Sequence, residues 1–254
     1  SHHDTVKPNQ GYTRDPFSAT IEEGKLYGLG SNDAGGALVS LIATFTHYYA
    51  HENLAYNLLM VASAEEENAG KKSLYYLIPS LPKIDVAIVG EPTLMNLAIA
   101  EKGLVVFDLR LKGTASHAAH PNSNNPMMKL PKLIHSIETL KFKKISPLLG
   151  PVKVTLTQID AGSQHNVVPS EVNLVLDVRV NECYTNQEIE QLVRSSLDCE
   201  VRARSLRLKS SSIDAEHPIV MAGKKLGKTT YGSPTLSDQA GLDCPSLKLG
   251  PGDS

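Results

Sequence analysis

The chain has 254 residues, of which 41% are hydrophobic and 20% charged, a composition typical of a globular protein with one or two domains. A formal net charge of -2 provides no field that would attract nucleic acid or an anionic membrane, so a small-molecule partner is favoured. The three cysteines are too few and too widely spaced for a disulfide scaffold or a zinc ribbon, which favours free thiols and a cytoplasmic protein. No run reaches the roughly 18 apolar residues that a membrane span needs.

The first hundred residues predict an alternation of helices and strands. Short apolar runs at 57–62 and 85–89 are typical of parallel strands covered on both faces, and the helical pattern occurs at 35–50 and 70–78.

A different arrangement is predicted from residue 104 onward. The expected order is a strand at 104–112, a helix at 125–140, strands at 152–160 and 172–180, a helix at 186–197 and a strand at 201–208. This β-α-β-β-α-β order is the ferredoxin-like pattern, and its length suits an independent domain. A further helix is predicted at 219–226. The sequence thus predicts an α/β domain, residues 1–103 and 210–254, interrupted by an inserted α+β domain, residues 104–209.

Short motifs rich in carboxylates or histidine stand beside these predicted strands and turns. They are His2-His3-Asp4, Asn32-Asp33, Glu65-Glu66-Glu67 and Gly90-Glu91-Pro92. Imidazole and carboxylate groups at the ends of buried strands suit a pair of divalent cations. Each motif also has a plain interpretation: an exposed terminal histidine pair or tag remnant, an N-cap aspartate, a solvated acidic face, and an unremarkable loop glutamate.

The order of the motifs resembles a known family. H-x-D-T-V is followed by Y-G-L-G-S-N-D, A-E-E-E and V-G-E-P-T, with further matches at 113–121, 164–169, 177–179, 233–238 and 250–252. The chain resembles the metal-dependent amidohydrolases and exopeptidases that include acetylornithine deacetylase, succinyl-diaminopimelate desuccinylase, aminoacylase and glutamate carboxypeptidase, with the acetylornithine and acetylcitrulline deacetylases as the nearest branch. The resemblance implies a zinc-exopeptidase-like catalytic domain with a mixed sheet, interrupted by an inserted ferredoxin-like dimerisation or lid domain.

Carried over residue by residue, the resemblance implies a site for two divalent metal ions. Zinc is the expected metal, and cobalt or manganese would also suit these ligands. His2, Asp33 and Glu91 are then ligands of one ion. Asp33 and Glu67 are ligands of the second.

The resemblance also assigns catalytic and substrate-binding roles. Glu66 is the expected general base, and Asp4 the partner that orients the histidine ligand. His117 is expected to reach a neighbouring subunit's active site and donate a hydrogen bond to the oxyanion. Asn166 and Arg179 lie where the family binds its substrate's carboxylate.

The residues by themselves leave plainer readings open for this second group. His117 is also readable as a loop histidine without a catalytic task. Arg179 is also readable as a strand arginine that pairs with Asp177 or Glu182.

The expected activity is hydrolysis of the amide bond of an N-acyl amino acid, of the N-acetyl- or N-succinyl-ornithine or -citrulline type used in arginine biosynthesis, by a cytoplasmic homodimer. Two alternatives are a dipeptidase or aminopeptidase of the same fold, and a non-catalytic dimerising metal-binding protein. The family carries a further strand and helix before the first motif and a metal-binding histidine after Gly-Pro-Gly, and neither occurs here. We therefore interpret the chain as an internal segment of a longer protein that lacks one metal ligand.

Overall fold

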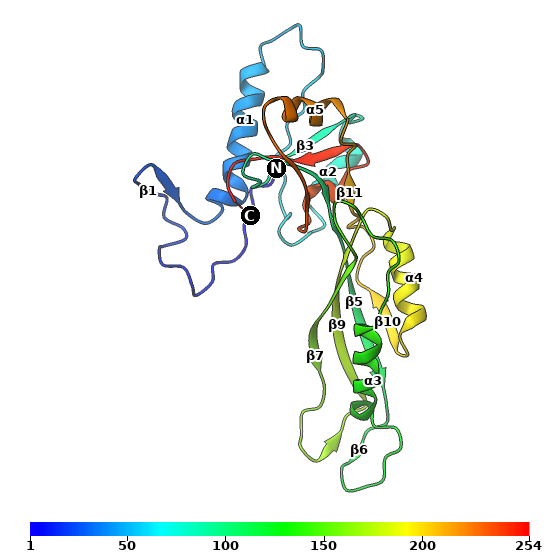
Figure 1. Cartoon of the computed structure of the whole chain (residues 1–254). Helices are drawn as coiled ribbons and strands as arrows, with labels where there is room; N and C mark the ends of the chain where they lie inside the picture. The colour runs from blue at the N-terminus through cyan, green and yellow to red at the C-terminus, as the bar shows by residue number, and fades with distance from the viewer. Residues whose placement is uncertain (254) are drawn as a thin grey trace. The chain divides into compact units, whose positions relative to one another are not determined.

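The computed structural model describes residues 1–253, which form two compact units (Figure 1). Unit 1 contains residues 1–100, 211–233 and those from 237 onward, and unit 2 contains residues 101–210 and 234–236. In the sequence, unit 2 is thus inserted into unit 1. Among residues 1–253, no helix combines the length and the apolar character that crossing a membrane requires.

A mixed sheet forms the centre of unit 1. Its strands, in spatial order, are β11 (Ser211–Ser212), β4 (Leu97–Glu101), β13 (Ser246–Lys248) and β3 (Ala87–Val89), with β12 (Thr230–Ser233) also paired to β4. Strand β13 runs parallel to β3 and antiparallel to β4. Ile99 and Leu247 of this sheet pack against Val220 of helix α5 (Pro218–Lys225), and this contact buries the centre of the sheet.

Unit 1 also contains elements outside this sheet. They are β1 (Thr20–Glu22), β2 (Lys25–Tyr27), η1 (Ser31–Gly36), α1 (Ala37–Tyr48), α2 (Leu74–Leu77), η2 (Ile78–Ser80) and η3 (Asp238–Gly241). The helix predicted at 35–50 corresponds to α1, which the π-helical turn η1 precedes. The helix predicted at 70–78 is shortened to the single turn α2, which begins only at Leu74 and passes into η2 at Ile78. Pro79 in η2 has no backbone N–H with which to continue the α-helical hydrogen bonds beyond this point.

The strand predicted at 57–62 is wrong. This apolar run forms no ladder in the structure, and the neighbouring Ser63 makes only an isolated parallel bridge to His2. Leu58 and Leu59 remain 47% and 49% exposed. An apolar run indicates only a preference for burial, whereas a strand also needs a neighbouring backbone with which to pair.

Unit 2 is a four-stranded antiparallel sheet with two helices on one face. The spatial order is β10 (Glu200–Ala203), β5 (Gly103–Lys112), β9 (Glu171–Val180) and β7 (Lys153–Asp160). The helices α3 (Pro126–Glu138) and α4 (Asn186–Ser196) lie beside this sheet (Figure 1). A separate pair of short strands consists of β6 (Ser116–His117) and β8 (Val167–Val168).

The alternating pattern of the two central strands explains this packing. Residues 105, 107, 109 and 111 of β5 are buried, as are residues 172, 174, 176, 178 and 180 of β9, so one face of the sheet meets the helices. Side chains cap both helix N-termini: Asn125 accepts from the backbone N–H of Met127, and Thr185 forms a capping box with Glu188.

The last strand predicted in this region is shorter than expected. Strand β10 ends at Ala203 instead of continuing to residue 208. The backbone N–H of Arg204 still donates to the carbonyl of Val106 on β5, and the next backbone contact with β5 is at Leu208, whose carbonyl accepts from the N–H of Leu104. Continuous strand pairing is therefore broken between these two points.

Candidate metal centre and active site

The site in unit 1 begins with His2, which is 1% exposed. The backbone N–H of His3 donates to the carbonyl of Ser63, and the N–H of Ser63 donates to the carbonyl of Ser1, both at 3.0 Å. The Nδ1 atom of His2 lies 2.9 Å from the backbone oxygen of Asp4. Because a carbonyl oxygen can only accept, Nδ1 carries a proton, and Nε2 is the atom presented to the acidic groups of the site.

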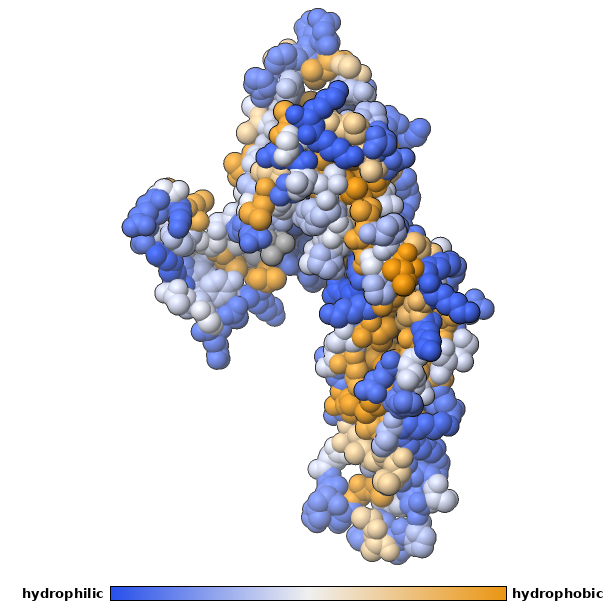
Figure 2. Space-filling model, viewed as in Figure 1, coloured by the Kyte–Doolittle hydropathy of each residue, from blue (hydrophilic) through white to orange (hydrophobic). Residues whose placement is uncertain are grey.

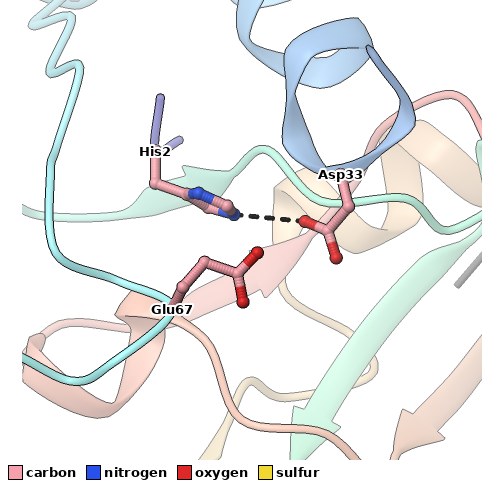
Figure 3. Close-up of side chains that lie close together, drawn as sticks. All are labelled: His2, Asp33 and Glu67. Carbon is pink, nitrogen blue, oxygen red and sulfur yellow. Dashed lines mark hydrogen bonds and ion pairs between the residues drawn. The ribbon is translucent and has the colours of Figure 1, made fainter. Parts of the chain in front are cut away.

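The side chains of Asp33 and Glu67 converge in front of Nε2 of His2. The Oδ1 atom of Asp33 lies 3.2 Å from Nε2 of His2, and the carboxylate of Glu67 points toward the same region (Figure 3). One ligand atom from each of these residues lies within 4.8 Å of the other two. Glu66 and Glu91 each place a carboxylate oxygen 3.8 Å from Nε2. The structure thus brings the four predicted metal ligands and the predicted general base together.

Local backbone structure places these carboxylates. Asp33 lies inside the turn η1, while Gly30 occupies the N-cap position, so the N-cap interpretation of Asp33 is wrong. Gly30 has a φ of 75°, and a Cβ atom there would lie 2.3 Å from the side chain of Thr5. Only glycine fits this left-handed, crowded position. Glu91 follows directly after β3 and Gly90, at the carboxyl end of a strand.

Asp4 connects the histidine segment with the acidic triplet. Its two carboxylate oxygens accept from the backbone N–H groups of Glu66 and Glu67, each at 3.2 Å. The same carboxylate lies 3.5 Å from Nδ1 of His2, farther than the backbone carbonyl of Asp4. Asp4 therefore orients the imidazole mainly through its backbone, while its side chain holds the turn that carries both glutamates.

The electrostatics of this cluster favour a bound cation. Burial raises the pKa of Glu66, the charge of Glu91 raises it further, and the value reaches about 8. Burial and the charge of Asp33 likewise raise the pKa of Glu67. Burial lowers the pKa of His2, but the hydrogen bond with Asp33 and the charges of Glu91 and Glu66 outweigh burial and raise the pKa to about 9. Crowded carboxylates and one imidazole are a donor set that fits a divalent ion such as zinc.

Sequence reasoning missed two residues beside this cluster. Ser63 donates a short hydrogen bond from its hydroxyl to Oδ2 of Asp238, and both residues are buried. The matching segment 233–238 pointed to this region but gave Asp238 no role. Ser63 carried no recognisable signal, because a lone serine after an apolar run is common.

In unit 2 the structure brings two of the three predicted residues together. His117 pairs with Val167 in the β6–β8 ladder, and the backbone N–H of Ala118 donates to the carbonyl of Asn166 at 2.9 Å. Nδ1 of His117 accepts from the backbone N–H of Ala119 at 3.1 Å, so the proton of a neutral His117 lies on Nε2. His117 is exposed and presents that donor to solvent.

Arg179 lies at the other end of this unit. It occupies the register position opposite Leu104, whereas Asn166 precedes the opposite end of β9 at Glu171. At 3.3 Å per residue, the strand between Glu171 and Arg179 spans about 26 Å. The guanidinium of Arg179 donates from Nε and Nη2 to the two carboxylate oxygens of Asp177, at 2.7 and 2.9 Å. Asn166 and Arg179 of one chain therefore do not share one small substrate.

Comparisons with known proteins give the family. The family model of peptidase family M20/M25/M40 matches residues 1–244. A succinyl-diaminopimelate desuccinylase of Pelagibacter ubique is 30% identical over 203 residues, which cover 74% of this chain and 53% of that protein. The chain thus spans about half the length of this curated relative.

Solved structures show the same fold. A tripeptidase from Staphylococcus aureus is 18% identical to this chain. The structural match covers 98% of this chain and 70% of the tripeptidase chain, with a TM-score of 0.73. An M20 family metallo-carboxypeptidase from Sulfolobus solfataricus is also 18% identical. Its match covers 98% of this chain and 75% of the carboxypeptidase chain, with a TM-score of 0.72. These matches confirm the predicted zinc-exopeptidase-like α/β fold class. The chain belongs to peptidase family M20/M25/M40.

Proposed function

We propose that this chain carries the metal-binding half of an active site that hydrolyses the amide bond of an N-acyl amino acid. The observation that carries the proposal is the convergence of His2, Asp33 and Glu67, with Glu66 and Glu91 beside them. A buried imidazole with a fixed tautomer among crowded carboxylates suits a metal-dependent hydrolase. A solvated acidic surface would not bury His2, nor leave the side chains of Glu66 and Glu91 only 12% exposed.

The donor set supports the metal ligands expected from the sequence. His2, Asp33 and Glu91 hold one divalent ion, and Asp33 and Glu67 a second. Divalent ions at such a site supply the positive charge that polarises a carbonyl oxygen and lowers the pKa of a nearby water. Zinc is the proposed metal, although carboxylate and imidazole ligands also accept cobalt and manganese.

Glu66 is the proposed general base. Its carboxylate is largely buried, and its pKa of about 8 brings it close to the operating range of a proton-transfer group. Glu66 accepts the proton of the attacking water and later delivers it to the nitrogen of the leaving amine. The products are a free acid and a free amino acid, so atoms and charge balance over the two steps.

His117 is the proposed oxyanion donor, supplied by a second copy of the chain. Its Nε2–H is available because Nδ1 accepts from the backbone of Ala119. Such a donor contributes roughly 3 kcal/mol to the transition state when it is aimed at the developing negative charge.

A homodimer through unit 2 is supported by two features. About 26 Å of strand separates Arg179 from the side of the unit that holds Asn166. An N-acyl amino acid is much shorter, so both residues can bind one substrate only if they come from two chains.

The second feature is an open apolar edge. Strand β7 is an edge strand, and beside it lies a hollow of about 280 Å³ lined by residues of α3, the following loop and β7 itself. Figure 2 shows apolar side chains along this part of unit 2. An apolar hollow next to unpaired strand edges suits a self-complementary contact, in which two β7 strands pair.

A substrate panel tests the proposed activity. Purified protein loaded with zinc is given N-acetylornithine, N-acetylcitrulline, N-succinylornithine, N-succinyl-diaminopimelate and unblocked dipeptides, and release of free amine is measured. We expect turnover of an N-acetyl- or N-succinyl-amino acid and little turnover of dipeptides; the name of the curated relative supports the succinyl group. Turnover of dipeptides alone would replace the proposal with a peptidase. Absence of both zinc binding and turnover would leave a non-catalytic protein.

A further inference from the structure

A buried hydrogen bond joins two distant parts of unit 1 behind the metal-ligand cluster. The hydroxyl of Ser63 donates to Oδ2 of Asp238, a contact between residues 175 positions apart in the chain. Ser63 is 1% exposed and Asp238 7% exposed. A carboxylate is rarely buried without a structural or functional reason, because removing its charge from water is costly.

Ser63 is also the backbone partner of the segment that carries His2. The two residues form a parallel bridge, and the carbonyl of Ser63 accepts from both the backbone N–H and Nδ1 of His3, at 3.0 and 2.6 Å. Ser63 therefore contacts the histidine segment through its backbone and Asp238 through its side chain.

Asp238 is in turn fixed to the central sheet. It begins the turn η3, whose next residue, Gln239, is fully buried and donates from Nε2 to the hydroxyl of Ser246 on β13, at 3.0 Å. The side chain of Ser237 accepts from the backbone N–H of Gln239. A chain of polar contacts therefore runs from β13 through η3 and Ser63 to the histidine segment.

We propose that Asp238 is a positioning residue of the metal site: through Ser63 it fixes the segment that carries His2, so that Nε2 faces Asp33 and Glu67. This inference rests on the proposed metal-dependent function. The rest of the segment between residues 57 and 62 forms no strand ladder, so its own backbone pairing does not hold Ser63 in place.

The charge of Asp238 adds an electrostatic effect. Burial raises the pKa of Asp238, while the hydrogen bond from Ser63 and the charge of His2 oppose this rise. The pKa of Glu66 is raised first by burial and by Glu91, and the charge of Asp238 adds to that rise, so Asp238 shares the field of the cluster. A divalent cation is consequently attracted by a carboxylate that does not belong to its proposed ligand set.

The test measures zinc affinity of the full chain by competition with a chromophoric chelator. The variants are Ser63→Ala, which removes the donor, Asp238→Ala, which removes acceptor and charge, and Asp238→Asn, which keeps an acceptor oxygen. The matched control is Ser73→Ala, because Ser73 is also a buried serine of unit 1 and its hydroxyl has no partner within residues 1–253. Thermal unfolding of the metal-free variants separates metal binding from general stability.

We expect Ser63→Ala and Asp238→Ala each to weaken zinc binding roughly tenfold or more, as is common for residues that orient metal ligands. Their effects should overlap in the double variant, because both break one contact. Asp238→Asn should lose less zinc affinity than Asp238→Ala, and Ser73→Ala should bind zinc as tightly as the unaltered protein. The absorption spectrum of the cobalt-loaded protein should change in Ser63→Ala, since it reports ligand geometry.

Two outcomes would overturn the inference in different ways. Variants that unfold at lower temperature yet keep the original zinc affinity and cobalt spectrum would show a purely structural contact. Unaltered protein that binds no zinc would refute the proposed function itself, and the positioning role with it.

Discussion

The backbone N–H of Glu66 donates a hydrogen bond to Oδ1 of Asp4 at 3.2 Å. The N–H of Glu67 donates to the other oxygen of the same carboxylate. One aspartate thus holds the turn on which the proposed base and a proposed metal ligand are adjacent. Neighbouring residues in such a turn point their side chains in different directions, and this lets the two glutamates perform separate tasks.

Substitution of Asp4 should therefore weaken metal binding. Asp4→Ala removes both backbone contacts, and we expect zinc affinity to fall by roughly 10- to 100-fold. Asp4→Asn retains only one acceptor oxygen, so its loss should be smaller. Zinc titration of both variants measures the effect. Equal affinity in Asp4→Ala and the unaltered protein would show that the turn keeps its shape without this carboxylate.

Glu66→Gln should abolish most of the activity and leave metal binding in place. The amide has nearly the same shape but cannot accept a proton, so turnover should fall by about 10²- to 10⁴-fold. Glu65→Gln is the matched control. The adjacent Glu65 has no proposed role in the site, and its side chain instead accepts a hydrogen bond from the backbone N–H of Lys72 at 2.9 Å. Turnover and zinc content are measured for both variants. Unchanged turnover in Glu66→Gln would exclude Glu66 as the base.

The metal-free protein should lose stability as the pH rises from about 4.5 to about 9. The pKa of Glu66 is raised from 4.5 to about 8, and that of His2 from 6.5 to about 9. Between these values Glu66 and His2 hold more protons in the folded state than in the unfolded state, so the stability that these two groups contribute is lost as the pH rises. Thermal unfolding across this range checks the direction.

The same experiment with Glu66→Gln isolates one group. This variant has no carboxylate to ionise at position 66, so its stability should fall less between about pH 5 and 8 than that of the unaltered protein. This range lies between the ordinary pKa of a glutamate, 4.5, and the raised pKa of Glu66, about 8. Bound zinc should also flatten the pH dependence, because the cation takes the place of the protons. A steeper loss in Glu66→Gln would contradict the raised pKa of Glu66.

Substitution of Arg179 should affect substrate binding more than chemistry. If Arg179 holds the substrate's carboxylate, Arg179→Lys loses the planar fork, and KM should rise roughly tenfold while kcat changes little. Asp177→Asn tests the contribution of the observed ion pair to the orientation of Arg179. Steady-state kinetics separate KM from kcat. An unchanged KM in Arg179→Lys would leave Arg179 as a structural partner of Asp177.

Disruption of the apolar hollow beside β7 should produce monomers. Ile134 of α3 lines this hollow, and Ile134→Glu places a charge in the proposed contact. Leu192→Glu is the control, since Leu192 is an exposed leucine on the other helix of unit 2. Light scattering coupled to gel filtration should show a dimer for the unaltered protein and Leu192→Glu, and a monomer for Ile134→Glu. A dimer in Ile134→Glu would place the interface elsewhere.

The elements of unit 2 were largely predictable from the sequence. The alternation in 104–112 and 172–180 appears in the structure as buried and less buried faces of β5 and β9. These patterns depend on side chains within one element, whose periodicity directly reflects the face that is buried. The strand predicted at 57–62, by contrast, does not form, because a strand also needs a partner strand, and the sequence of the run does not specify one.

The sequence alone determined which residue types were available for a metal site and in what order they occur. Only the tertiary structure decided that His2, Asp33 and Glu67 meet, that Asp4 holds the acidic turn by its side chain, and that Ser63 binds Asp238. Residues 31 to 175 positions apart make these contacts. Their geometry depends on the packing of whole elements around the sheet, which no local pattern contains.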